Sequence, residues 1–224
     1  MQPIEDTAPR APEIDRSYSA ILLGLGLFHL LGGASLTAAA PGARFPANIL
    51  LLVGAASLAT AILRWLRLPV YLPATAGVSL FLILSFPLGT AACVYWLKKV
   101  RPRELKEMSD PERASFRYTV GLYVAGLLLC LTALVFQLMV DTAPPDGRGL
   151  WEIFRLCFFV AALLLLAIGA LRSLKKPVSY MATLILNVLL VLYLPLGTCF
   201  ALFWFLAVRK HDLFIYRGQL VPSA

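Results

Sequence analysis

Long stretches without a charged residue limit what this chain can fold into. Residues 18–40 and 118–140 contain no Asp, Glu, Lys or Arg, and both are rich in Leu, the first also in Ala and Gly and the second also in Val. An apolar stretch of about 18 residues or more is typical of a membrane-spanning helix. Because a backbone inside lipid must satisfy its own hydrogen bonds, such stretches are expected to be helical. The composition agrees: 60% of the residues are hydrophobic and 14% are charged, against about 45–50% and 25% in soluble domains.

An internal repeat with an offset of 108 residues is the second constraint. Residues 63–101 align without a gap to residues 171–209, and 16 of these 39 positions are identical, including a Pro-Leu-Gly-Thr motif and the Trp that follows it. Further upstream, Tyr18-Ser19 resembles Tyr118-Thr119 after a gap. A repeat of this kind indicates a duplicated structural unit. The sequence therefore predicts an all-α integral membrane protein with six hydrophobic helical segments, arranged as two three-segment internal repeats.

The expected boundaries follow from this alignment. A polar N-terminal tail covers residues 1–17 and a C-terminal tail covers residues 209–224. Repeat one spans residues 18–101, a basic linker spans residues 102–117, and repeat two spans residues 118–208. The linker contains a helix-start signal, with Ser109 or Asp110 as cap and Pro111 in the first turn. The six segments are expected at residues 18–40, 47–63, 70–97, 118–140, 150–171 and 178–208.

The Pro-Leu-Gly-Thr motif marks a helix break in the third segment of each repeat. Proline lacks a backbone N–H donor and clashes with the preceding helical turn, glycine permits unusual backbone angles, and threonine can cap a new helix. The motif therefore predicts either a kink in one long helix or a turn between two short ones. The expected structural helix breaks are Pro87, Gly89, Thr90, Pro195, Gly197 and Thr198.

Segment length and charge disagree on whether the third segment of each repeat crosses the bilayer or turns back. Segments 70–97 and 178–208 are long enough to cross a bilayer, which favours six crossings. Six crossings would divide the Lys and Arg residues almost evenly, nine to eleven, between the two sides. If each third segment turns back instead, the division becomes 17 to 3, as expected when one side is cytoplasmic. The orientation, and the choice between crossing and re-entrant segments, stay open at this point.

The positive charge of the chain points to lipid. The net charge of +8 is carried by the loops between segments, so anionic lipid headgroups are expected partners and nucleic acid is not. The four cysteines lie in apolar segments without a Cys-X-X-Cys pattern, which argues against a disulfide framework or a zinc site. We expect no cofactor and no metal. The expected interface anchors are Arg64, Arg67, Trp96, Lys98, Lys99, Arg172, Lys175, Lys176 and Trp204.

Few polar residues lie within the apolar segments. His29, Ser79 and Asn187 form the candidate polar site, and Ser79 and Asn187 occupy equivalent positions in the two repeats. An ionisable group inside a membrane is a functional candidate by default. However, the rough counterpart of His29 is Leu129, and a neutral His bonded to a backbone carbonyl is the simpler interpretation.

Short motifs in both repeats carry a family resemblance. They are FHLLGG at residues 28–33, LRWLRLP at 63–69 and FPLGTAACVYW at 86–96, with LRSLKKP and LPLGTCFALFW in the second half. This pattern resembles a group of small bacterial multi-pass membrane proteins with an FP-[LI]-GT motif followed by Trp. The second half lacks the His and the Trp of the basic patch. The resemblance implies this architecture and a bacterial cytoplasmic membrane, and it implies no activity.

Two classes of function fit these observations. The sequence has no Ser/His/Asp set, metal-ligand cluster or phosphate-binding loop, so we expect no enzyme. The first hypothesis is a structural or accessory membrane component that contacts a second copy or another membrane protein. The alternative is a small transporter or channel, because helix breaks at matching places in two halves favour a binding site there. The paired motifs would then converge around a wet cavity with Ser79 and Asn187.

Overall fold

The computed structural model describes residues 16–85, 87–106, 108–176, 178–191 and 196–220, and within these ranges not the side chains of residues 41, 84, 196 and 215–220. All regular structure in the described ranges is helical. The helices, in chain order, are α1 (Arg16–Ala39), η1 (Pro41–Ala43), α2 (Arg44–Trp65), α3 (Tyr71–Phe81), η2 (Leu82–Leu84), α4 (Leu88–Tyr95), the π-helix η3 (Trp96–Val100), α5 (Arg101–Glu104), α6 (Asp110–Thr142), α7 (Pro145–Ser173), α8 (Val178–Val191), α9 (Leu196–Phe203), the π-helix η4 (Trp204–Val208) and α10 (Arg209–Leu220).

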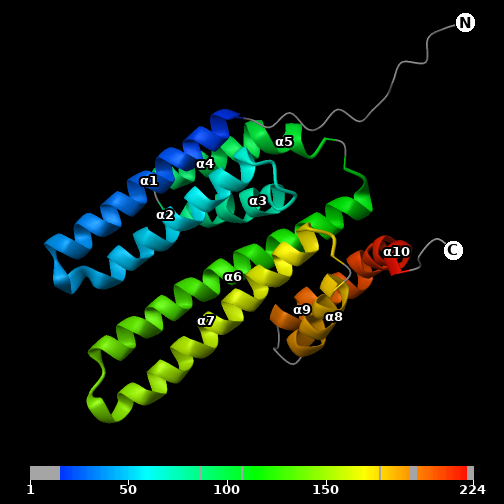
Figure 1. Cartoon of the computed structure of the whole chain (residues 1–224). Helices are drawn as coiled ribbons and strands as arrows, with labels where there is room; N and C mark the ends of the chain where they lie inside the picture. The colour runs from blue at the N-terminus through cyan, green and yellow to red at the C-terminus, as the bar shows by residue number, and fades with distance from the viewer. Residues whose placement is uncertain (1–15, 86, 107, 177, 192–195, 221–224) are drawn as a thin grey trace, which may run out of the picture.

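Four of the described helices, α1, α2, α6 and α7, are long and apolar enough to cross a membrane. They form two antiparallel pairs, α1 with α2 and α6 with α7 (Figure 1). The most apolar of them, α7, leaves large side chains such as Ile153 and Leu164 more than half exposed. Exposed apolar side chains on helices of this length are the surface that a lipid bilayer requires, as expected for a membrane protein.

Small residues let α1 and α2 approach closely. A Cβ atom added to Gly26 would lie 2.9 Å from the backbone nitrogen of Leu58, and one added to Gly54 would lie 2.8 Å from that of Leu30. In lipid, where there is no hydrophobic force between helices, such close packing is a main source of association. Gly26 of α1 and Gly54 of α2 therefore permit the close contact between these two helices.

The third segment of each half differs from the full crossing that its length favours. Residues 71–100 divide into α3 and α4 with the short η2 between them, and α8 is likewise followed by the separate helix α9. α3, with 11 residues, is about 16 Å long, which is too short to cross a core of about 30 Å. Glu104, which follows the third segment, is paired with Arg64, which precedes it. The segment therefore leaves and returns at the same end of α2.

The second half has the same course. Asp212 in α10 follows its third segment and pairs with Arg172 in the last turn of α7. α8 packs against α9 (Figure 1). The six long crossing helices considered from the sequence are thus four long helices and two pairs of short ones over the described residues.

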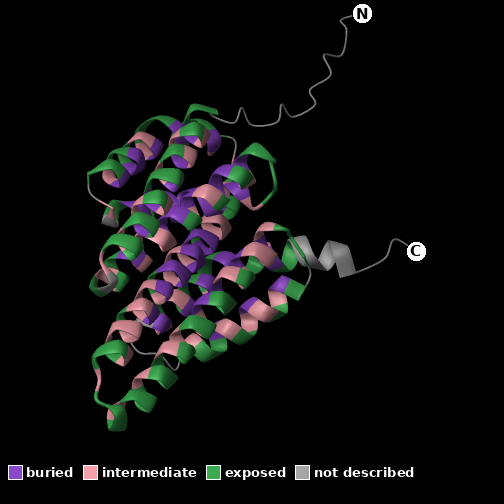
Figure 2. Ribbon diagram, turned by 60° about the vertical axis from the view of Figure 1, so that its left-hand side comes forward, coloured by how far each residue is buried: buried purple, intermediate pink, exposed green. Residues whose placement is uncertain are grey.

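The two halves meet along α6. α2 and α3 pack against it, and a Cβ atom on Gly77 of α3 would lie 2.7 Å from the Cβ of Tyr123 of α6. Buried residues gather along this central contact, while the outer faces of the helices are intermediate or exposed (Figure 2). The buried apolar residues form two clusters, one in each half, and the cluster of the first half extends to Val120 and Leu127 of α6.

The local sequence accounts for how α6, α2 and α7 begin or end. The predicted cap of α6 is confirmed: Ser109 is the N-cap, its backbone nitrogen donates to Glu112 at 2.9 Å, and a proline follows in the first turn. α6 therefore begins eight residues before the predicted segment. α2 and α7 end in matching Schellman motifs, with Arg67 and Lys175 in the left-handed region at φ 53° and 52°.

Candidate functional site

A buried ion pair closes the first half at the α5 end. Arg64 donates to both carboxylate oxygens of Glu104, at 2.7 Å from Nη2 and 3.3 Å from Nη1. Both side chains are almost completely excluded from solvent. Arg64 also donates to the hydroxyls of Ser19 and Thr75, each at 3.2 Å. The ring of Tyr18 lies 5.4 Å from the guanidinium carbon, within range of a cation–π contact.

A second buried ion pair closes the other half. Arg172 donates to Asp212 at 2.6 Å and 3.2 Å, and both side chains are 2% exposed. Arg172 also donates to Thr119 and Thr183, at 3.2 Å and 3.3 Å. The ring of Tyr118 lies 4.9 Å from its guanidinium carbon.

The two clusters use matching positions. Arg64 and Arg172 are 108 residues apart in the chain, as are Thr75 and Thr183. The two carboxylates, Glu104 and Asp212, differ by the same offset and lie 40 residues after their arginines. A charge taken out of water must be paired and hydrogen-bonded, and both arginines meet this condition. These clusters, which we call the two arginine staples, therefore hold the end of each third segment against the base of its helix pair.

Four of the expected interface anchors lie in the protein interior. Arg64, Arg172, Trp96 and Trp204 are buried rather than placed at the protein surface. Their charge and aromatic character suggested anchors, but each has a binding partner or a packing role in the interior. The remaining expected anchors are exposed at the α5 end of the molecule: Arg67, Lys98, Lys99, Lys175 and Lys176.

Sequence reasoning missed the two acidic partners. The alignment of the repeats was ended at Arg101 and Arg209, three residues before Glu104 and Asp212. Extending it with the same offset places one carboxylate opposite the other, each followed by Leu. That match is a signal for the pairing, whereas the boundaries predicted from the sequence place Glu104 in the linker and Asp212 in the C-terminal tail.

Ser79 and Asn187 belong to two separate tyrosine contacts. Ser79 shares a hydrogen bond of 2.5 Å with the Tyr18 hydroxyl, and Asn187 donates to the Tyr118 hydroxyl at 2.7 Å. Both side chains are completely buried. Each lies in its own half, against the tyrosine of its own staple. The structure therefore uses these two polar residues at matching places rather than bringing them together.

His29 is buried and hydrogen-bonded at both ring nitrogens. Its Nδ1 lies 2.7 Å from the carbonyl oxygen of Leu25, and Nε2 lies 2.6 Å from the hydroxyl of Ser85. A carbonyl oxygen can only accept, so Nδ1 carries a proton and donates. In a neutral ring Nε2 then accepts from Ser85. His29 therefore links α1 to Ser85, the residue that directly follows η2, and its bond to a backbone carbonyl agrees with the simpler interpretation of the sequence.

The helix breaks lie within their own halves. Thr90 donates to the carbonyl of Ile83 at 3.2 Å and Thr198 to that of Val191 at 3.0 Å. A Cβ atom at Gly89 would collide with the carbonyl oxygen of Leu82, so only glycine permits this close return. Pro195 lies outside the described residues. α4 packs against α1 and α3, whereas α9 packs against α8 (Figure 1).

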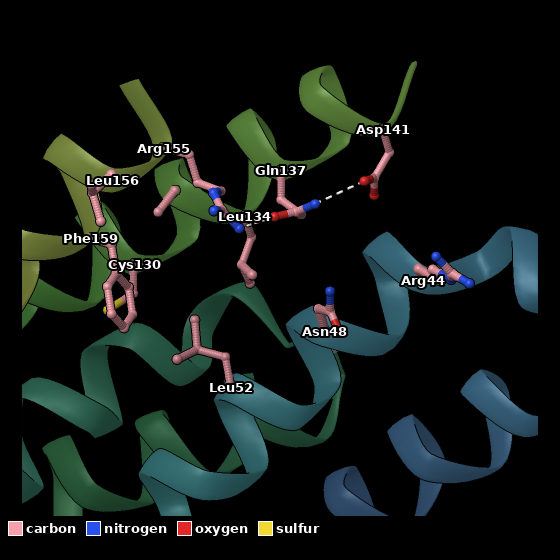
Figure 3. Close-up of a pocket in the computed structure, with 11 residues that line it drawn as sticks. Arg44, Asn48, Leu52, Cys130, Leu134, Gln137, Asp141, Arg155, Leu156 and Phe159 are labelled. Atoms are coloured by element: carbon pink, nitrogen blue, oxygen red, sulfur yellow. Dashed lines mark hydrogen bonds between the residues drawn. The ribbon is translucent and has the colours of Figure 1, made fainter. Parts of the chain in front are cut away.

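A pocket of about 670 Å³ opens between the two halves, at the end away from the staples. α2, α6 and α7 each provide part of its wall (Figure 3). Its lining combines charged, amide and apolar side chains: Arg44, Asn48, Leu52, Cys130, Ala133, Leu134, Gln137, Asp141, Arg155, Leu156 and Phe159.

A chain of hydrogen bonds crosses one wall of this pocket. Arg155 donates to the Gln137 carbonyl oxygen at 2.5 Å, and the Gln137 amide donates to Asp141 at 2.8 Å. Figure 3 shows this row on α6 and α7, with Arg44 and Asn48 across from it on α2. Within the described part of the chain, Arg44 has no carboxylate oxygen within 4 Å. The pocket thus combines an unpaired cation with an anchored carboxylate.

The described residues contain no group of three or more His, Cys, Asp or Glu side chains that could hold a metal ion. Comparisons with protein-family models, with curated proteins and with solved structures found no match to this chain.

Proposed function

We propose that this chain is a non-enzymatic structural or accessory component of a membrane, with four crossing helices and two re-entrant hairpins. The observation that carries the proposal is the pair of arginine staples. In each staple a buried arginine and a buried carboxylate bond to each other, and this ion pair connects a hairpin to its helix pair. Charges used in this way stabilise a fixed arrangement and are not available to bind a solute.

The charge distribution supports the re-entrant topology. Arg44, Arg148 and Arg155 lie near the turns between α1 and α2 and between α6 and α7, and the other described Lys and Arg residues lie toward the opposite end. Cytoplasmic loops carry the excess of Lys and Arg, so the end with α5 and α10 faces the cytoplasm in the proposed orientation. The two halves are then parallel repeats in a bacterial cytoplasmic membrane.

An accessory role implies a protein neighbour. α7 and the outer face of α1 bury few residues within the chain, which leaves them free for a second copy or another membrane protein. The exposed cations at the cytoplasmic end favour anionic lipid headgroups, at about 1 kcal/mol for each residue near the surface.

A small transporter or channel is the alternative, and one observation favours it. The Oδ1 atom of Asn187 is buried without a hydrogen-bond partner in the described structure. A buried acceptor of this kind costs about 1–3 kcal/mol when it stays unpaired, and a water molecule or solute would satisfy it. In this alternative the second hairpin would open to admit one.

Cysteine labelling tests the proposed topology of four crossing helices and two re-entrant hairpins. In a background without native cysteines, single cysteines at Ser109, Gly147 and Gln219 are treated in intact cells with an impermeant maleimide. The proposed topology predicts that only Gly147→Cys is labelled. Labelling of Gln219→Cys together with Gly147→Cys would instead mean that the third segments cross.

A second pair of variants separates the accessory role from transport. Ser79→Cys and Asn187→Cys are exposed to a small, water-soluble thiol reagent from each side of the membrane. A closed interior predicts no reaction at either position. Rapid reaction at Asn187→Cys, with the fully buried Cys93 of α4 as a control, would mean a hydrated path and would favour the transporter.

A further inference from the structure

The pocket between α2, α6 and α7 is polar at its mouth and apolar at its floor. Along α2 the lining residues Arg44, Asn48 and Leu52 are spaced four apart, which places them on one helix face over about 12 Å. Along α6 the lining runs from Asp141 to Cys130 in the same direction. The walls therefore change together from charged to apolar with depth.

The mouth of the pocket carries opposite charges that do not neutralise each other. Arg44 is exposed and no ion pair joins it to Asp141 within 4 Å among the described residues. Asp141 is oriented by Gln137, which is in turn held by Arg155. One oxygen of the Asp141 carboxylate accepts this bond, and the second oxygen is left for a donor from outside the chain.

We propose that this pocket binds one phospholipid with a primary amine in its headgroup. The phosphodiester lies against Arg44, the ammonium group donates to Asp141, and the upper part of an acyl chain lies against Leu52, Leu134 and Phe159. A guanidinium recognises phosphate oxygens, and a carboxylate accepts from an N–H donor. A choline headgroup has no N–H to donate, so the pocket distinguishes the two headgroups at Asp141.

The position of the pocket suits this ligand. It is open to the outside of the helix bundle at the end where α1 turns into α2 and α6 turns into α7. In the orientation proposed above, on which this part of the inference rests, that end faces away from the cytoplasm. A lipid of that leaflet reaches the pocket without passing through the protein, and it fills the space between the two halves.

Native mass spectrometry of the full-length protein in detergent tests this site without depending on its orientation. The protein is titrated with phosphatidylethanolamine, phosphatidylcholine and phosphatidylglycerol of the same chain length. The expected result is a single saturating adduct that prefers phosphatidylethanolamine. Loss of one charge-assisted hydrogen bond lowers affinity by about tenfold, and this sets the size expected for each variant.

Substitutions at two exposed residues are expected to change the binding of phosphatidylethanolamine and phosphatidylcholine in different ways. Asp141→Asn lowers phosphatidylethanolamine binding by about tenfold, to the level of phosphatidylcholine, whose binding stays unchanged. Arg44→Gln lowers the binding of both lipids by a similar factor. The controls are Asp146→Asn and Arg148→Gln, which remove the same charges from exposed positions at the same end but outside the pocket lining.

Three results would overturn the inference. They are equal binding of phosphatidylethanolamine and phosphatidylcholine to the unaltered protein, a preference for phosphatidylglycerol, and a preference for phosphatidylethanolamine that survives Asp141→Asn. Because the assay measures lipid adducts in detergent, any of these can occur while the cysteine labelling still supports the proposed topology. Failure of the lipid site is therefore distinguishable from failure of the proposed function.

Discussion

The two arginine staples have the same arrangement, but their carboxylates accept from different sets of donors in the described structure. Glu104 accepts from Arg64 through two bonds. Asp212 accepts from Arg172, from the Ser115 hydroxyl at 3.2 Å and from the Trp204 indole at 2.9 Å. The equivalent indole nitrogen of Trp96 is buried without a partner in the described structure.

Asp212, the shorter of the two acids, therefore accepts from more donor groups in the described structure than Glu104 does. Asp212 has one methylene fewer than Glu104, and its carboxylate is reached by donors from α6 and η4. A buried carboxylate that accepts from several donors keeps more of its stabilisation when one donor is removed. The comparison teaches that matching positions in the two halves need not carry equal energy, and it predicts unequal responses to the same substitution.

Removing the arginines should have the largest effect. Arg64→Met leaves Glu104 buried without its two donor bonds, and we expect a loss of about 3–5 kcal/mol in the free energy of unfolding. Arg172→Met should cost less, because Asp212 keeps Ser115 and Trp204. Equilibrium unfolding in mixed detergent and dodecyl sulfate micelles measures both. The double variant Arg64→Met with Glu104→Met should recover most of the loss, and equal losses in the two halves would contradict the comparison.

The two tryptophans should differ next. Trp204→Phe removes a hydrogen bond to a buried charge, and we expect a loss of about 1.5–3 kcal/mol. Trp96→Phe removes an indole N–H that has no partner, so only the smaller packing loss remains. The same unfolding experiment compares them directly. A Trp96→Phe variant as damaged as Trp204→Phe would mean that Trp96 has a partner in solution.

The tyrosine hydroxyls should give a smaller difference. Tyr118→Phe leaves the Asn187 amide with one bond fewer, and we expect a loss of about 1 kcal/mol. Tyr18→Phe should cost less, since the single O–H proton of Ser79 keeps its acceptor, the carbonyl of Thr75 at 2.5 Å. Asn187 also keeps a bond, to the carbonyl of Thr183 at 2.8 Å, but its second amide N–H is left without an acceptor. Thermal unfolding of the detergent-solubilised variants should rank them in this order, and the reverse order would show that Tyr18 carries the more important bond.

The smallest effect should be equal in both halves. Arg67 and Lys175 both adopt a left-handed backbone conformation, which costs a non-glycine residue about 1 kcal/mol. Arg67→Gly and Lys175→Gly should each stabilise the protein by about 0.5 kcal/mol, after the extra entropy of glycine in the unfolded chain is taken into account. Unfolding midpoints that move apart would indicate that one of these exposed side chains has a role in binding.

The sequence predicts the long helices well and the ends of the third segments poorly. Uncharged stretches around residues 18–40 and 118–140 locate α1 and α6, and the cap at Ser109 locates the start of α6. The return of the third segment depends on pairing between residues 40 positions apart, such as Arg64 and Glu104. Local patterns carry no information about such pairing. In the sequence, a charged residue near a helix end has the same pattern whether its side chain lies at the membrane interface or forms a buried ion pair.

The candidate sites show the same limit. Ser79 and Asn187 were recognised as polar and equivalent, but the tyrosines that bind them, Tyr18 and Tyr118, come from the first helix of each half. The pocket was not expected at all, because its polar residues are distributed over α2, α6 and α7. Gln137 and Arg155 are 18 residues apart in the chain, and their contact requires the packed α6–α7 pair.

The spacing within each staple has a consequence for how the protein is made. Each arginine precedes its acidic partner by 40 residues. Translation adds about 5–20 residues per second, so each arginine is synthesised about 2–8 s before the carboxylate that neutralises it. During that interval the arginine charge must stay at the headgroup level or in the insertion machinery. The helix pair is then without the carboxylate that pairs with the arginine. Each half of the chain therefore passes through an interval of this length, which ends when the residues after its third segment supply the counter-ion.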